Sequence, residues 1–267
     1  MGTVLVRNEK SVPMKPPSTE GRLVYAIGDV HGSLALLEAL IASLAADALR
    51  TRPRLKPMLI LLGDYIDRGE KSSQVLDLIY RIKLLDVFET RTLMGNHERA
   101  MLNFLDDTRA GPNWLAYGGA ETLSSYGIAP PDPRVGAAGW EAVRSALAIA
   151  AEHHLEFLRA LELMVVVGDY AFVHAGIRPG VKLDRQMEQD VLWIRDEFRA
   201  SNLAHEKIIV HGHSPATQAQ LAKNRLGIDT GAYTTGVLTA LRLDGETQRL
   251  IQVKTGSAAA QPAAQSA

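Results

Sequence analysis

Residues 58–82 read MLILLGDYIDRGEKSSQVLDLIYRI, and they carry the clearest fold signal in the chain. Five consecutive apolar residues at 58–62 are typical of a strand that is buried on both faces. The loop GDYIDRG at 63–69, bounded by glycines, interrupts this run. Apolar residues then recur at helical spacing over 72–82, after a first serine. The stretch therefore predicts a strand, a polar loop and a helix, the repeating unit of a parallel sheet.

The same unit occurs before and after this stretch. The apolar run 23–27 ends in GDVHG at 28–32, and a helical pattern begins at Ser33, which can cap it. The run 90–94 ends in GNHE at 95–98, again followed by a helical pattern. Three strand–loop–helix units in a row predict a mixed α/β fold.

The second half of the chain has a different pattern. Residues 164–173 and 237–253 each consist of two apolar runs around a Gly-Asp or Asp-Gly pair, which is typical of a hairpin. Residues 208–210 form a further short strand. Parallel units followed by antiparallel hairpins predict an α/β fold with two packed mixed β-sheets flanked by helices.

The pattern along the chain predicts one folded domain with two unstructured ends. Residues 1–20 lack periodicity and are expected to form a disordered N-terminal segment. Residues 21–255 form the domain, in which 106–160 are expected to be a helical insert. Residues 256–267 are rich in alanine, glutamine and serine and predict a disordered tail.

The composition restricts the chemistry and the partners. The 267 residues include 29 basic and 30 acidic side chains, so a formal net charge of −1 gives no general attraction to nucleic acid or to an anionic membrane. No cysteine is present, which excludes a cysteine nucleophile as well as disulfides. The sequence has neither a signal-peptide core nor a membrane-spanning run, so we expect a cytoplasmic protein.

Polar side chains suited to metal binding or proton transfer follow every predicted strand. In chain order they are Asp29, His31, Asp64, Asp67, Asn96, His97, His174 and His213. Ligands in open α/β sheets bind at the carboxyl ends of the strands, so these side chains are expected to meet on one rim. His211 flanks His213 and is interpreted as an ordinary residue at a strand end.

Carboxylate, imidazole and amide oxygen together suit two divalent ions, with manganese expected and iron or zinc as alternatives. Two such ions can clamp the attacking and the departing oxygen of an in-line displacement. Asp64 lies centrally in the motif order and is the expected bridge. Two dications against Asp29 and Asp64 leave a positive site, which would attract a phosphate dianion.

The motifs GDVHG, GDYIDRG, GNHE, HAG and GHS occur in this order and resemble those of a known family. The chain is similar to the phosphoprotein phosphatase family of calcineurin-like metallophosphoesterases, in particular its small bacterial serine/threonine protein phosphatases. The resemblance extends from about residue 22 to about residue 245, and it is weakest over 106–160.

The resemblance implies a role for each motif residue. One metal ion would be held by Asp29, His31 and Asp64, and the other by Asp64, Asn96, His174 and His213. His97 would be the general acid, oriented by Asp67, while Arg68 and Arg195 would clamp the phosphate together with Asn96. A metal-bound hydroxide would then attack phosphorus in phosphoserine and phosphothreonine proteins, and possible substrates extend to phosphotyrosine.

Two other functions remain open at this point. A sister branch with nearly the same motifs hydrolyses diadenosine polyphosphates, as a symmetrical dinucleoside tetraphosphatase does. Glu98 and the sequence Asp-Arg-Gly at 67–69 favour the phosphatase branch, since the dinucleotide branch usually has Asp in place of Glu98. A catalytically inactive scaffold that binds phosphopeptides is disfavoured, because every motif residue that the chemistry needs is present.

Several other residues receive structural interpretations. Asp229 resembles half of an aspartic protease dyad, but a single copy lacks its partner. Trp114 is expected in the core. His153, His154 and His205 are expected to be solvated on polar helices.

Overall fold

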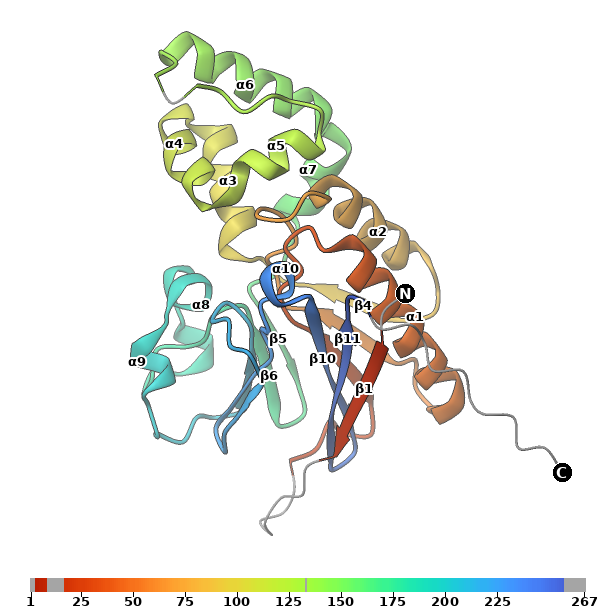
Figure 1. Ribbon diagram of the computed structural model, residues 1–267. Helices are drawn as coiled ribbons and strands as arrows, with labels where there is room; N and C mark the ends of the chain where they lie inside the picture. The colour runs from red at the N-terminus through yellow and green to blue at the C-terminus, as the bar shows by residue number, and fades with distance from the viewer. Residues whose placement is uncertain (1–2, 9–16, 133, 257–267) are drawn as a thin grey trace, which may run out of the picture.

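The computed structural model describes residues 3–8, 17–132 and 134–256, and it contains two β-sheets that pack face to face (Figure 1). The predicted α/β fold with two mixed sheets is confirmed. Helices cover the outer face of the larger sheet, and a helical lobe stands at one end of the pair of sheets (Figure 1).

The larger sheet has the strand order β1-β11-β10-β2-β3-β4. Its parallel part follows the three predicted units, whereas β10, β11 and β1 join it in antiparallel pairs. The strands are β1 (Thr3–Asn8), β2 (Leu23–Ile27), β3 (Met58–Leu61), β4 (Glu89–Thr92), β10 (Val237–Asp244) and β11 (Thr247–Lys254).

The smaller sheet has the order β5-β6-β7-β9-β8 and is also mixed. The predicted hairpin at 164–173 provides β5 and β6, which pair antiparallel, and β7 adds in parallel to β6. The strands are β5 (Met164–Val167), β6 (Tyr170–Val173), β7 (Ile208–His211), β8 (Gln220–Leu221) and β9 (Arg225–Gly227).

The central strands are buried on both faces. In β2, Val24 and Ala26 face the core between the two sheets, whereas Tyr25 and Ile27 face the core beneath the helices. This explains why the strand has an apolar run instead of an alternating pattern. The outer core is covered by α1 (Leu34–Thr51) and α2 (Ser72–Leu84).

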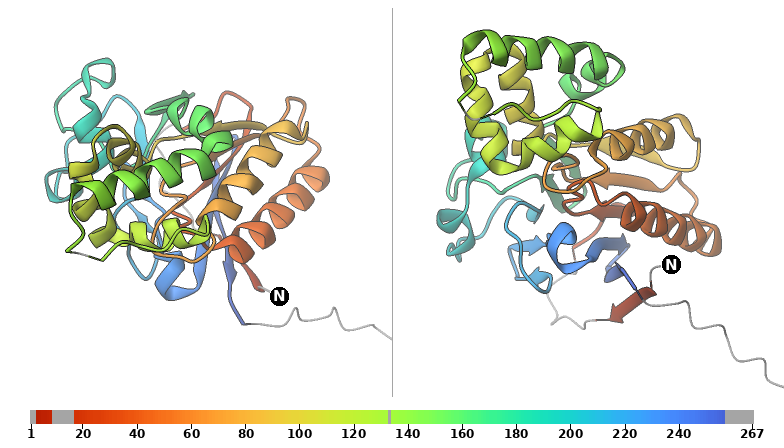
Figure 2. Two further views of the ribbon diagram at one scale, coloured as in Figure 1. Left: turned by 90° about the horizontal axis from the view of Figure 1, so that it is seen from above. Right: turned by 45° about the horizontal axis from the view of Figure 1, so that its top comes forward.

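Residues 96–160 form the helical lobe beside the sheets (Figure 2). Residues 115–119 form a π-helical segment in which Gly118 has a φ of 107°. Its helices are α3 (Asn96–Asp106), α4 (Gly111–Trp114), α5 (Ala120–Ser125), α6 (Ala137–Ala150) and α7 (Glu152–Arg159), with a 3-10 turn at Thr108–Ala110. Outside the lobe lie α8 (Glu188–Trp193), α9 (Asp196–Arg199), α10 (Ala232–Thr235) and a 3-10 turn at Leu183–Arg185.

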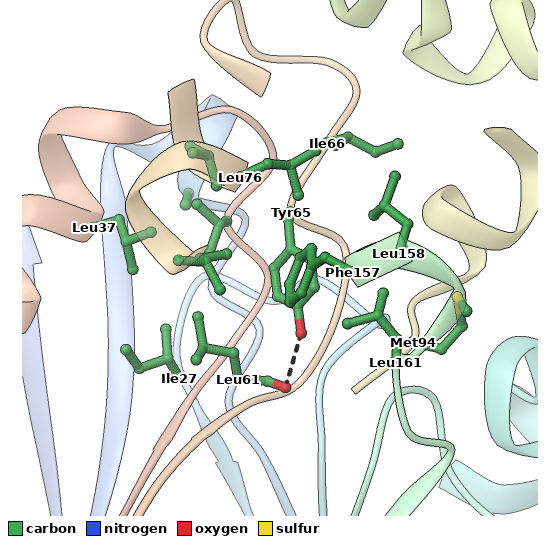
Figure 3. Close-up of a cluster of buried hydrophobic side chains, with 14 of the residues drawn as sticks. Ile27, Leu37, Leu61, Tyr65, Ile66, Leu76, Met94, Phe157, Leu158 and Leu161 are labelled. Carbon is green, nitrogen blue, oxygen red and sulfur yellow. Dashed lines mark hydrogen bonds between the residues drawn. The ribbon is translucent and has the colours of Figure 1, made fainter. Parts of the chain in front are cut away.

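A buried apolar cluster joins the lobe to the loop after β3 (Figure 3). Phe157 and Leu158 of α7 lie in this cluster with Tyr65 and Ile66. The hydroxyl of Tyr65 also shares its one proton between the carbonyls of Leu61, at 3.1 Å, and Leu93, at 2.7 Å. The GDYIDRG loop therefore packs against the helical lobe and is also hydrogen-bonded to the main chain of the larger sheet.

The N-terminal segment differs from the prediction of disorder over 1–20. Thr3–Asn8 pair with β11 as the edge strand β1, and the backbone N–H of Ser18 donates to Asp169 at 2.8 Å. An edge strand is held by main-chain hydrogen bonds, so it needs no apolar periodicity to form. The predicted tail lies, from residue 257 onward, outside the described residues, as do residues 9–16. Within the described part of the chain, none of the helices has the length and apolar character needed to cross a membrane.

Candidate metal centre

Two groups of buried ligand side chains lie at the carboxyl ends of β2, β3, β4, β6 and β7. One group is His31, Asp64 and His97, and the other is Asp64, His174 and His213. Their ligand atoms lie within 4.8 Å of one another in each group, and Asp64 belongs to both. The fold thus brings together residues that are up to 182 positions apart in the sequence, counting from His31 to His213.

Asp64 lies between the two groups in space as it does in the motif order. Its Oδ2 atom is 3.5 Å from Nε2 of His31 and 3.4 Å from Nε2 of His174. Its Oδ1 atom accepts a hydrogen bond from the backbone N–H of His97 at 3.1 Å. One carboxylate oxygen is therefore held by the protein, and the other is directed at imidazoles on both sides.

The backbone fixes the protonation of two of these imidazoles. Nδ1 of His31 is 2.8 Å from the carbonyl of Ile66, and Nδ1 of His174 is 2.9 Å from the carbonyl of Leu62. A carbonyl can only accept, so Nδ1 carries the proton in both rings and each Nε2 presents a lone pair. Burial lowers the pKa of His31 to about 3 and also lowers that of His174, which keeps both rings neutral.

Asn96 brings an amide oxygen to the second group. Its Oδ1 atom is 2.7 Å from Nδ1 of His213 and 2.9 Å from Nε2 of His174. Since Nε2 of His174 has a lone pair, two electron-rich atoms face each other at hydrogen-bond distance. A cation placed between such atoms would remove this repulsion, so the donor set fits a divalent metal ion.

Asp29, the remaining predicted ligand, lies outside both groups and beside His213. Its carboxylate accepts the backbone N–H of His213 at 3.0 Å. A Cβ on Gly212 would lie 2.0 Å from Oδ1 of Asp29, so the close approach of this segment requires glycine. Burial and the carboxylate of Asp229 hold the pKa of Asp29 well above its usual range. A dication would offset this unfavourable burial of negative charge.

His97 and Asp67 form a buried pair beside the two groups. Nδ1 of His97 is 2.7 Å from Oδ2 of Asp67, and Nε2 of His97 is 3.9 Å from Oδ2 of Asp64. Burial alone would lower the pKa of His97, but the carboxylates of Asp64 and Asp67 outweigh it and raise the pKa. The imidazole is therefore held in one orientation and can carry a proton.

Asp67 is itself held by the helical lobe. Thr122 donates a hydrogen bond to its Oδ1 atom at 2.6 Å, and Nε1 of Trp114 donates to its Oδ2 atom at 3.0 Å. The prediction for Trp114 as a core residue is consistent with its burial, but no sequence pattern indicated its hydrogen bond to Asp67. The lobe therefore orients Asp67, and Asp67 in turn orients His97.

The two predicted phosphate clamps lie at the mouth of the site. Nη2 of Arg68 is 3.2 Å from Nε2 of His97, and Nε of Arg195 donates to Nε2 of His213 at 3.0 Å. Tyr233 of α10, which the sequence did not single out, accepts a hydrogen bond from Nη1 of Arg68 at 2.9 Å. Its ring also lies 5.2 Å from the ring of His31. Tyr233 thus fixes Arg68 over the metal ligands.

Glu98 has a different role from the one that the sequence suggested. It is fully buried, and its two carboxylate oxygens accept the backbone N–H groups of four residues. The donors are Asp64 at 2.9 Å, Tyr65 at 2.7 Å, Ile66 at 3.2 Å and Gly95 at 3.0 Å. Glu98 therefore holds the loop that carries Asp64, and in this structure it is not placed to read the substrate.

Backbone strain is concentrated at the same residues. A positive φ is unfavourable for residues other than glycine, by roughly 1–2 kcal/mol each. It occurs at His31 (44°), Asp64 (52°), Asp67 (68°), Arg68 (67°) and His213 (61°). Such strain persists only where the surroundings enforce it, and here the hydrogen bonds of the site provide that constraint.

Asp229, for which a protease role was rejected, lies beside Asp29, and burial together with Asp64 raises its pKa to about 6. Two interpretations from the sequence need correction. His154 is buried instead of solvated, because Tyr126 and Asp77 enclose it. His205 is half-buried in a segment without helix, and its ring stacks on Phe198. The partners of His154 lie 28 and 77 positions away in the sequence, so no local pattern could have revealed them.

The two sheets, the rim of strand ends and the buried groups that share Asp64 define a metal-dependent phosphoesterase. Residues 23–236 match the family described as calcineurin-like phosphoesterase, and the chain belongs to this family.

Relatives within the family differ in their named activities. The chain is 27% identical over 231 residues to serine/threonine-protein phosphatase 2 of Escherichia coli, covering 83% of this chain and 93% of the relative. It is also 27% identical over 240 residues to the asymmetrical bis(5'-nucleosyl)-tetraphosphatase PrpE of Geobacillus thermodenitrificans, covering 81% and 88%.

Solved structures have the same fold. A proposed diadenosine tetraphosphatase matches with a TM-score of 0.58 and 18% identity, over 90% of this chain and 96% of the other. A cold-active protein tyrosine phosphatase matches with a TM-score of 0.57 and 16% identity, over 85% and 78%. The solved structures thus agree on the fold, while the activities named for the relatives differ.

Proposed function

We propose that this phosphoesterase removes phosphate from phosphoserine and phosphothreonine in proteins. In this proposal Asp29, His31 and Asp64 hold one divalent ion, and Asp64, Asn96, His174 and His213 hold the other. Manganese suits this mixture of oxygen and imidazole ligands, and iron or zinc would also fit it.

The metal pair, when bound, would activate water as the nucleophile and offset the charge of the phosphate. The protein side chains have separate tasks. Arg68 and Arg195 bind phosphate oxygens with planar guanidinium groups, and Tyr233 keeps Arg68 in position. His97 donates a proton to the leaving oxygen, and Asp67 keeps Nε2 of His97 directed at the reacting group.

The observation that supports this substrate class is the His97–Asp67 pair. Asp67 accepts from His97, Trp114 and Thr122, so the orientation of the imidazole is strongly constrained. Hydrolysis of a serine or threonine ester expels an alkoxide, which is a poor leaving group unless it is protonated. Hydrolysis of a phosphoanhydride expels a phosphate that needs far less help. A well-oriented proton donor is therefore worth most on a phosphoprotein.

A groove lined in part by Trp193, two positions before Arg195, is also suited to a polypeptide. It has a volume of about 450 Å³ and is lined by Arg99, Asn103, Glu188, Gln189 and Trp193. Nε of Arg99 lies 2.7 Å from the carboxylate of Glu188, so the charge of the groove is balanced. A peptide flanking the phosphorylated residue would meet both hydrogen-bonding groups and an indole, whereas a tetraphosphate would require an excess of cations.

The second candidate is hydrolysis of a dinucleoside polyphosphate. Relatives named as asymmetrical tetraphosphatases match the chain about as well as the protein phosphatases do. The half-buried indole of Trp193 in the groove could stack on a nucleobase. This function would use the same ligands, the same clamps and His97.

A direct competition between the substrates tests the proposal. The manganese-loaded chain would be given a phosphoserine peptide and diadenosine tetraphosphate in parallel, and phosphate or nucleotide release would be measured. We expect the peptide to have a kcat/KM at least about tenfold higher, equivalent to about 1.4 kcal/mol in the transition state. A preference of the same size for the dinucleotide would contradict the proposal and support the second candidate.

A further inference from the structure

A second cluster of ligand side chains lies far from the rim, where α7 packs against α2 (Figure 1). It consists of Asp77 on α2 and of His153 and His154 at the start of α7. Their ligand atoms all lie within 4.8 Å of one another. None of these side chains contributes to the metal centre or to the proposed reaction.

The distances in this cluster match those of a tetrahedral zinc site. Oδ1 of Asp77 is 3.2 Å from Nε2 of His154 and 3.6 Å from Nε2 of His153. Bond lengths of about 2.0–2.2 Å place neighbouring ligand atoms of tetrahedral zinc about 3.4 Å apart. Adjacent residues of a helix usually point to different sides, so the convergence of both rings on one carboxylate is unusual.

A half-buried tyrosine supports the inner ligand. The hydroxyl of Tyr126, at the end of α5, is 2.7 Å from Nδ1 of His154. A hydroxyl can donate or accept a hydrogen bond. It can therefore accept a hydrogen bond from the Nδ1–H group when Nε2 binds a metal ion. Burial is the main cause that lowers the pKa of His154, which favours the neutral ring that a metal requires.

The cluster is open on its outer side. The side chain of His154 is 2% exposed, whereas those of His153 and Asp77 are 61% and 49% exposed. A metal ion could therefore enter from solvent and keep a water molecule as its remaining ligand. The geometry points to a third metal site, with Asp77, His153 and His154 as ligands for a zinc-class divalent ion.

The position of this site gives it a structural role. A metal ion there joins α2, which follows the GDYIDRG loop, to α7 at the end of the lobe, and Tyr126 links it to α5. The same lobe supplies Trp114 and Thr122 to Asp67. Zinc at the third site would thus stabilise the lobe in the position that orients the catalytic pair.

The test is a count of bound zinc in the full chain. Metal-free protein would be dialysed against zinc at about 1 µM, and bound metal would be measured by atomic emission. We expect His153→Ala and Asp77→Asn each to bind about one zinc ion fewer per chain than the wild type, because three protein ligands are needed. Glu156→Gln is the matched control, because it removes an exposed carboxylate from the same helix and should keep the full content.

A variant of the metal centre distinguishes zinc binding at this site from binding at the metal centre. Asp64→Asn should lose metal at the centre but retain zinc at the third site, and zinc should raise its unfolding temperature by about 2–4 °C or more. Adding His153→Ala to that background should abolish the shift. Equal zinc content in wild type and His153→Ala, or binding only at zinc concentrations on the order of 0.1 mM, would mean an adventitious ion only and would overturn the inference.

Discussion

His97 shows how a single side chain depends on its partners. Its Nδ1 atom is tied to Asp67 at 2.7 Å, and Nε2 faces the rim. We expect His97→Ala to reduce kcat on a phosphoserine peptide by about 10²–10⁴, and the loss on p-nitrophenyl phosphate to be smaller because its phenolate leaves without a proton. Steady-state kinetics on both substrates measure the difference. Equal losses of kcat on both substrates would show that His97 is not the general acid.

Glu98 is the residue whose interpretation changed most. The sequence suggested that Glu rather than Asp at this position marks a protein phosphatase, but the side chain is buried against four backbone N–H groups. We expect Glu98→Asp, which is one methylene shorter, to lose some of these bonds and to destabilise the fold by about 1–3 kcal/mol. Denaturant unfolding gives this value, and activity should fall by a similar factor on peptide and dinucleotide. A switch in substrate preference would instead restore Glu98 as a specificity residue.

The helical lobe contacts Arg68 of the site through Gly118. Gly118 has a φ of 107°, its carbonyl accepts the N–H of Arg68 at 3.1 Å, and a Cβ there would lie 2.6 Å from that nitrogen. We expect Gly118→Ala to displace Arg68 and to raise KM for phosphate esters several-fold, without loss of metal. Steady-state kinetics and metal analysis check both parts.

Gly127 provides the matched control for this substitution. It lies in the same lobe with a φ of 74°, but a Cβ there would contact no heavy atom within 4 Å. Gly127→Ala should therefore cause only backbone strain, about 1 kcal/mol of stability, and leave KM unchanged. If both variants raise KM equally, the effect belongs to the strain of the lobe and not to contact with Arg68.

Metal binding should stabilise the whole molecule, because the two sheets meet at buried carboxylates. Asp29, Asp64 and Asp229 lie together at the rim, and burial raises the pKa of Asp29 and of Asp229. We expect manganese at a hundredfold excess over its Kd to increase stability by about 2.7 kcal/mol, and a chelator to reverse this. Thermal unfolding of His153→Ala, with and without manganese, measures the centre alone. Asp64→Asn should show little of the effect, and a full effect in that variant would contradict the bridging role.

The order of strands and loops could be predicted because it depends on local patterns. Runs of five residues that end in Gly-Asp or Gly-Asn mark the strands and the polar loops after them, and the ends of parallel strands must meet at one edge. The members of the metal centre could therefore be named before their distances were known. The edge strand at Thr3–Asn8 could not, because its pairing with β11 depends on backbone hydrogen bonds and leaves little trace in side chains.

Residue types and their periodicity were enough to give the α/β fold, the rim and its ligands. The contacts that orient those ligands came only from the folded chain: Trp114 and Thr122 on Asp67, Tyr233 on Arg68, and Glu98 under the loop of Asp64. The physical reason is the separation of the bonded partners along the sequence. Periodicity reports which face of an element is buried, whereas a hydrogen bond between side chains 47 or 165 positions apart exists only after packing has brought them together.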